Sequence, residues 1–136
     1  MTARVRDLAA LMAFLEARAA MPFAWGNRAN DCVSFAASAV KAQTGRNPIT
    51  GLRWASLRGA VKAVEKVGGI EAALDARFDR IAPAMAQRGD IAAVAAEDGP
   101  FPIRLMIVEG ETLVGPSDRG LRRMPRAAMC AAWSIG

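Results

Sequence analysis

The sequence predicts an α+β fold, in which helices come first and a small antiparallel sheet follows. In the first half of the chain, apolar residues recur at helical spacing between segments that carry helix caps and stops. After Pro83, short apolar runs alternate with clusters of Gly, Pro and Asp, which is the pattern of strands and turns. A chain of 136 residues is long enough to bury one core of its own. We therefore expect a single domain over residues 1–136.

The first helix is expected over residues 4–20. Thr2 is its expected N-cap, and the helix must end before Pro22, which biases the preceding residue away from helical geometry. Its apolar stripe is formed by Leu8, Leu11, Met12 and Leu15. We expect this stripe to pack against the rest of the domain.

The second helix is expected over residues 33–43. Asn30 or Asp31 supplies its cap, and Gly45 ends it. Small residues surround this helix on nearly all sides, so we expect it to lie buried in the centre of the domain.

Two more helices and the strands complete the prediction. A third helix spans residues 56–67 with Ser56 as its cap, and a fourth spans residues 70–78. The expected strands cover residues 90–95, 103–109, 112–115, 121–124 and 131–135, with a helical turn at 126–129.

Large side chains are scarce in this alanine-rich sequence. It holds 30 Ala against five Phe, three Trp and no Tyr, so the core must depend on its few aromatic residues. The expected anchors are Trp25, Trp54, Trp133, Phe14, Phe23 and Phe35.

The absence of histidine excludes several kinds of catalysis. Ser-His-Asp and Cys-His chemistry in their usual form both need imidazole, as does His-ligated zinc. Two cysteines without histidine do not make a zinc or iron–sulfur ligand set. We therefore expect neither a metal nor another cofactor.

The net charge of +5 and the pI of about 10.2 direct attention to acidic partners. However, the basic residues alternate with acids along most of the chain, which is typical of solvated faces. The dense exception is the arginine cluster of Arg119, Arg122, Arg123 and Arg126. This cluster fits an acidic protein surface or a nucleic acid, and solvation alone also explains it; we do not expect nucleic acid to be the main partner.

The first twenty residues carry charges throughout, so we expect no signal peptide there. No apolar run approaches the ~20 residues that span a bilayer, so we expect no membrane span. The chain is expected to be cytoplasmic when synthesised, with Cys32 and Cys130 as free thiols.

Cys32 is the candidate nucleophile. It follows Asp31 at the start of the second helix, where unpaired backbone N–H groups and the helix dipole stabilise a thiolate. A cysteine in such a place is also often a small buried apolar residue, and the spacing alone does not separate the two interpretations.

Five short motifs, taken in order, resemble a known family. Trp25-Gly26 and Asp31-Cys32, followed by a helix of small residues, are similar to the nucleophile region of the NlpC-type cell-wall peptidases, which have a papain-like fold. The whole chain more closely resembles a family of phage and prophage proteins related to those peptidases. The motifs are residues 22–26, 31–37, 44–48, 88–90 and 132–133.

The resemblance implies a papain-like (NlpC-type) domain with Cys32 at the nucleophile position. It also places Arg104, or a neighbour, at the position of the family's catalytic base. Arginine stays protonated and has no lone pair to accept a proton, so it cannot serve as that base. Asp31, Asp90 and Glu109 are the substitute carboxylates, each of which would need an upward pKa shift to work near neutral pH.

The resemblance and the missing base together predict a pseudoenzyme. We expect a structural or assembly protein of a phage or prophage tail tip, which reaches the virion after synthesis and contacts the tail hub and tip proteins. The alternative is an active peptidoglycan peptidase or amidase that uses Cys32 with a base other than histidine. A small basic protein associated with nucleic acid is the third hypothesis.

Overall fold

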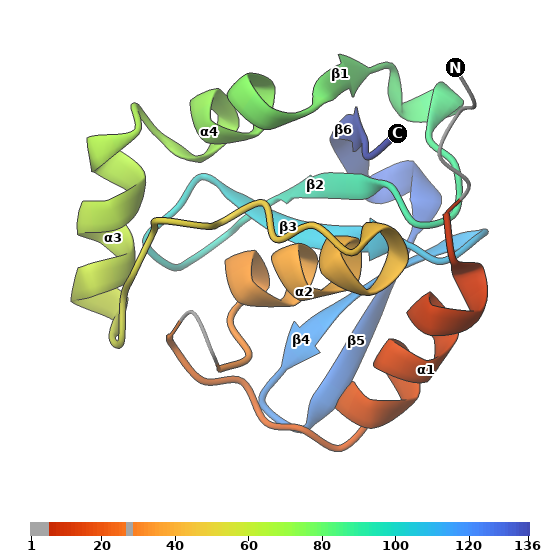
Figure 1. Ribbon diagram of the computed structural model, residues 1–136, viewed down its shortest axis with the longest axis horizontal. Helices are drawn as coiled ribbons and strands as arrows, with labels where there is room; N and C mark the ends of the chain where they lie inside the picture. The colour runs from red at the N-terminus through yellow and green to blue at the C-terminus, as the bar shows by residue number, and fades with distance from the viewer. Residues whose placement is uncertain (1–5, 27–28) are drawn as a thin grey trace.

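The computed structural model describes residues 6–26 and 29–136, and within these residues the chain is α+β, as expected. Four α-helices are followed by an antiparallel sheet of six strands (Figure 1). The helices are α1 (Leu8–Arg18), α2 (Cys32–Thr44), α3 (Leu57–Lys66) and α4 (Ile70–Arg77). The strands are β1 (Asp79–Ile81), β2 (Ile91–Ala95), β3 (Ile103–Val108), β4 (Thr112–Ser117), β5 (Gly120–Pro125) and β6 (Met129–Ser134).

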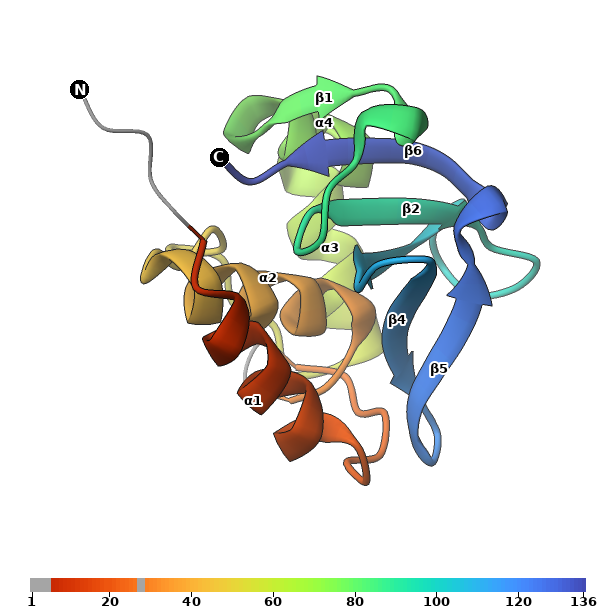
Figure 2. The same ribbon diagram turned by 90° about the vertical axis from the view of Figure 1, so that its right-hand side faces the viewer.

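The strands lie in the order β1-β6-β2-β3-β4-β5, so the last strand inserts between the first two. Two 3-10 turns flank this arrangement: η1 (Pro83–Met85) follows β1, and η2 (Arg126–Ala128) leads into β6. Figure 2 shows α1 and α2 on one side of the strands, with α2 next to the sheet and α1 beside it. None of the described helices is long and apolar enough to cross a membrane.

The first helix begins later than expected. Asp7 caps it by accepting a hydrogen bond from the backbone N–H of Ala10, and this interaction fixes the start at Leu8. Thr2, the expected cap, lies outside the described residues. The expected apolar stripe is also only half correct. Leu11 and Leu15 are buried against α2, whereas Leu8 and Met12 are 37% and 46% exposed, because α1 covers α2 along a narrow contact.

The core lies between α2 and the sheet. Phe35 and Trp133 are fully buried there and Trp54 is nearly so, as expected for anchors. Phe14, Phe23 and Trp25 are only partly buried. They instead contact other aromatic rings at the edge of the core. The ring centroids of Phe14 and Phe35 are 5.2 Å apart, and those of Phe23 and Trp25 are 5.1 Å apart.

The other face of the sheet carries a second, smaller apolar cluster. Successive residues of a strand point to opposite faces, so Ala93 and Leu105 face α2 while Ala92 and Met106 face away from it. Because the alanines of the neighbouring strands β2 and β6 are small, side chains of the two apolar clusters can pack close to the backbone on both faces of the sheet.

The β4–β5 hairpin packs against the end of α1. A Cβ atom on Gly120 would lie 2.0 Å from the carbonyl oxygen of Ala19, and Gly120 has a φ of +121°. Only glycine satisfies both conditions. The backbone N–H of Phe23 also donates to the Ser117 carbonyl at 2.9 Å. These two contacts join the β4–β5 hairpin to the end of α1 and to the loop that follows it.

Candidate functional site

The carboxylate of Asp31 holds the start of α2 in place. Its Oδ1 accepts a hydrogen bond from the backbone N–H of Ser34 at 2.8 Å, which makes Asp31 the N-cap. Its Oδ2 accepts from the backbone N–H of Gly26 at 2.9 Å and from the indole Nε1 of Trp54 at 2.8 Å. Asp31 is fully buried, so all three donors depend on it. The bonds of this side chain thus join the Trp25-Gly26 loop, the start of α2 and the segment before α3.

The loop before α2 is fixed by two more buried polar side chains. The hydroxyl of Ser34 donates to the Gly26 carbonyl at 2.6 Å. The side chain of Asn30 accepts from Arg18 Nη1 at 2.7 Å and donates to the carbonyls of Met21 and Pro22. The sequence left the cap open between Asn30 and Asp31; the structure assigns the cap to Asp31 and gives Asn30 the role of tying down the loop.

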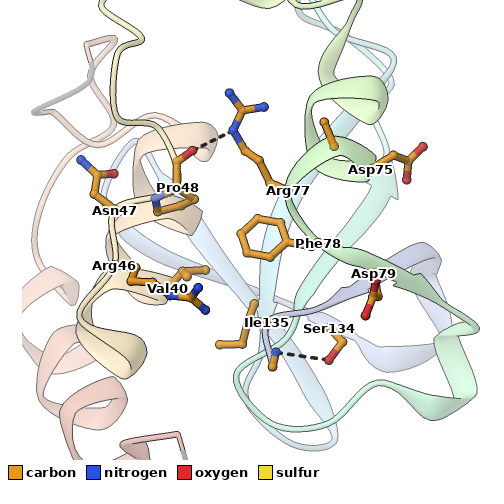
Figure 3. A pocket seen from close by; sticks show the side chains of 12 residues that line it. Val40, Arg46, Asn47, Pro48, Asp75, Arg77, Phe78, Asp79, Ser134 and Ile135 are labelled. Atoms are coloured by element: carbon orange, nitrogen blue, oxygen red, sulfur yellow. Dashed lines mark hydrogen bonds between the residues drawn. The ribbon is translucent and has the colours of Figure 1, made fainter. Parts of the chain in front are cut away.

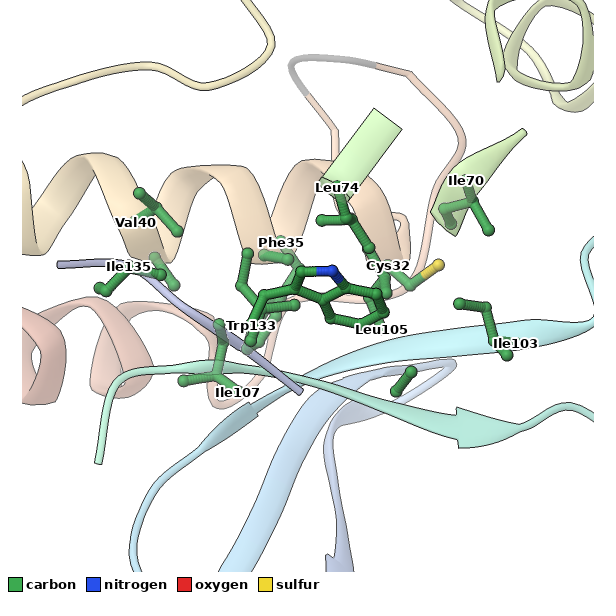
Figure 4. Close-up of a cluster of buried hydrophobic side chains, with 14 of the residues drawn as sticks. Cys32, Phe35, Val40, Ile70, Leu74, Ile103, Leu105, Ile107, Trp133 and Ile135 are labelled. Carbon is green, nitrogen blue, oxygen red and sulfur yellow. The ribbon is translucent and has the colours of Figure 1, made fainter. Parts of the chain in front are cut away.

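Cys32 lies inside the apolar core at the first turn of α2. The residue is 6% exposed, and its thiol lies on the side of the cluster that holds Ile70 and Ile103 (Figure 4). Burial above all, together with the negative charge of Asp31, raises the pKa of the Cys32 thiol to about 11. A hydrogen bond from the Leu105 backbone and the positive charge of Arg104 lower it by less. Cys32 is therefore a neutral thiol near pH 7.

Arg104, which the resemblance to the NlpC-type peptidases would place at the position of the base, turns toward the surface. It lies on β3 opposite Val94 of β2, and its guanidinium Nη2 is 3.4 Å from Asp98 Oδ1. Asp98 is almost fully exposed, so this ion pair contributes little to stability. Arg104 acts on Cys32 through its charge alone and has no atom that can accept a proton.

Two of the three substitute carboxylates lie away from Cys32. Asp90 precedes β2 and Glu109 follows β3, and the four residues from Leu105 to Glu109 span about 13 Å of extended strand. Asp90 is buried and pairs with Arg6 Nη2 at 2.6 Å.

Glu109 is held by its own partners. Its carboxylate accepts from Arg123 Nε at 2.6 Å and from the Thr112 hydroxyl at 2.6 Å. Partial burial raises the pKa of Glu109, but the hydrogen bonds from Arg123 and Thr112 outweigh it and hold the pKa below its ordinary value. A general base near neutral pH needs the opposite shift.

The sequence model of a family described as a domain of unknown function (DUF6950) matches residues 3–135. The chain belongs to this family. No curated protein and no solved structure matches it.

Beside the first turns of α2, this DUF6950 chain has a narrow apolar cavity, which Cys32 does not line. It lies between α2, α3 and α4, has a volume of about 50 Å³, and is lined by side chains such as Val33, Trp54 and Ile70. That volume admits a few water molecules, but the lining offers almost no polar group to hold them. The cavity is too small for a peptide substrate.

A wider groove lies at the far end of α2 (Figure 3). It has a volume of about 500 Å³ and lies between the loop after α2, the end of α4 and the end of β6. Val40, Phe78 and Ile135 form an apolar floor, and Arg77 bridges to the Pro48 carbonyl at 2.8 Å. The eight residues that separate Val40 from Cys32 place this groove about 12 Å along the helix from the thiol.

No three Cys, Asp or Glu side chains of the described residues gather closely enough to hold a metal ion. The structure thus brings Asp31, Cys32 and the β3 segment at Arg104 together and leaves Asp90 and Glu109 apart. The contribution of Trp54 could not be read from its sequence position, because it depends on a contact with Asp31, 23 residues away.

Proposed function

We propose that this chain is a non-catalytic, NlpC-like domain with a papain-like arrangement, and that it serves as a structural or assembly subunit of a phage or prophage tail. The resemblance of its five ordered motifs to phage and prophage proteins supports the tail role. A helix that carries Cys32 at its first turn and packs against an antiparallel sheet is compatible with the papain-like arrangement.

The burial of Cys32 is the observation that carries the non-catalytic part of the proposal. A nucleophilic cysteine needs a lowered pKa and access to substrate, whereas this thiol is buried and its pKa is raised to about 11. The residue at the base position is an arginine, and Asp31 is fully engaged as a cap. Loss of general acid–base help alone costs about 10²–10⁴-fold in rate.

The tail role predicts that assembly needs the fold and not the thiol. In a lysogen that carries this gene, its deletion should abolish infectious particles, and the wild-type gene should restore the titre. We expect Cys32→Ala to restore it within about twofold, because the change removes one sulfur atom from an apolar site. The readout is the particle titre, with tails counted by electron microscopy and circular dichroism of the purified variant as the check on folding.

Two results would contradict the proposal. A folded Cys32→Ala protein that fails like the deletion would show that thiol chemistry is required. A deletion strain that still yields normal tails would remove the tail role.

A further inference from the structure

The four arginines of the cluster at 119–126 have different surroundings in the folded chain. Arg126 donates to three backbone carbonyl oxygens and is partly buried, so it is structural. Arg123 pairs with Glu109. The side chains of Arg119 and Arg122 are exposed, and no bonded partner exists for either within the described part of the chain. Two uncompensated cations therefore remain at β5 and its hairpin turn.

β5 is an edge strand of the sheet, since its only strand partner among the described residues is β4. Leu121 lies opposite Pro116, and Pro125 lies opposite Thr112. Proline has no N–H, so these must be the pairs of the antiparallel ladder that exchange no hydrogen bonds. Hydrogen-bonded and non-hydrogen-bonded pairs alternate along the ladder, so Arg123, two residues from both Leu121 and Pro125, also belongs to a pair that exchanges no hydrogen bonds.

The backbone groups of such residues point away from the neighbouring strand. Leu121 and Arg123 therefore offer two N–H donors and two carbonyl acceptors to the side of β5 that has no strand. The available segment is short. The hairpin at Gly120 packs against α1 at one end, and Pro125 interrupts the row of donors at the other.

The charges on this edge select what can bind there. Arg122 shares a face of the sheet with Met124, whereas Arg123 lies on the other face. Two copies of β5 paired edge to edge would bring these arginines together, and facing like charges destabilise a strand pair. An extended strand with carboxylates would instead gain both the backbone bonds and a charged partner for Arg122.

We propose that the free edge of β5 binds an extended acidic segment of a partner protein by strand addition, with Arg119 and Arg122 pairing its carboxylates. This deepens the proposed assembly role, on which it rests, by naming the surface and the chemistry of the tail partner.

The test uses a fluorescent six-residue peptide that alternates glutamate with valine, and it measures binding to the full chain by anisotropy at about 50 mM salt. Alternation places all the carboxylates on one face of the added strand. We expect Arg122→Glu to weaken binding about tenfold or more, and Arg58→Glu, an exposed arginine on α3, to change it less than twofold. The same peptide with alternate backbone nitrogens methylated keeps its charge but loses donors, and we expect it to bind at least about tenfold more weakly.

Three outcomes would overturn the proposal. Equal binding of the methylated peptide would show simple charge attraction without strand addition. No binding at 1 mM peptide would remove the site. Tighter binding of a twelve-nucleotide single-stranded DNA that Arg122→Glu abolishes would assign the edge to nucleic acid. Failure here leaves the assembly role standing if Cys32→Ala still restores the particle titre, so the two proposals can fail separately.

Discussion

Replacing Asp31 by alanine should lower the free energy of unfolding by about 3–5 kcal/mol. The change removes the N-cap of α2, which alone is worth about 1 kcal/mol. It also deprives the Gly26 N–H and the Trp54 indole N–H of their acceptor in a fully buried place. Each buried donor left without a partner costs about 1–3 kcal/mol. Against a typical total of about 5–15 kcal/mol, much of the stability would be lost.

Urea unfolding followed by circular dichroism measures this change, and Asp7→Ala is the matched control. Asp7 also caps a helix with one side-chain hydrogen bond, but it is exposed, so its loss should cost only about 1 kcal/mol. Catalytic carboxylates are often kept at the expense of stability. If Asp31→Ala cost no more than Asp7→Ala, or stabilised the protein, the structural role given to Asp31 would be wrong.

Trp133→Ala is the second large effect, with an expected loss of about 3–5 kcal/mol. The indole is fully buried in the main core and is among its largest side chains. Its Nε1 donates to Asp75 at 2.9 Å, and the Arg80 guanidinium lies 4.9 Å from the ring centroid. Removing it leaves a cavity where β6 meets α2 and α4.

Two controls separate the cavity from the hydrogen bond. Trp133→Phe should cost less than Trp133→Ala, because the phenyl ring fills most of the cavity, while Asp75 keeps its pairing with Arg80 in both variants. Trp25→Ala, at a partly buried tryptophan, should also cost less. Thermal unfolding of the three variants gives the comparison. Equal losses for Trp133→Ala and Trp25→Ala would contradict the assignment of Trp133 as the main anchor.

Local sequence was enough to predict the elements that carry their own end signals. α2, α3 and α4 begin and end within two residues of the expected positions, because Asp31, Ser56 and the glycines near Gly68 act within one turn. β1 was missed, since a strand of three residues with two charges has no pattern of its own and forms only by pairing with β6. The start of β6 was missed for the same reason, because its strand pairing depends on β2: Met129 was assigned to a helical turn, and Cys130 to no element.

The chemical character of the candidate site depends on contacts that the local sequence does not show. Position in the first turn of a helix favours a thiolate at Cys32. The core brings Ile70 of α4 and Ile103 and Leu105 of β3 around it from two distant segments, and the resulting burial outweighs the effect of the helix on the pKa of Cys32. In the same way, the sequence did not distinguish the four arginines of the cluster at 119–126. Arg123 and Arg126 differ from the other two because the fold gives their side chains partners.

The central claim is that Cys32 is a structural thiol, and the pH dependence of its alkylation tests this most directly. The rate of iodoacetamide modification would be followed in Cys130→Ser protein from pH 6 to pH 10, with unfolded protein as the reference. At pH 8 a thiol of pKa about 11 has roughly two hundredfold less thiolate than a free thiol of pKa ~8.5, and burial slows the reaction further. We therefore predict at least a hundredfold slower reaction than in the unfolded chain, with a rate still rising at pH 10. A fast reaction with a midpoint well below 8.5 would contradict the account, because it would show an activated nucleophile.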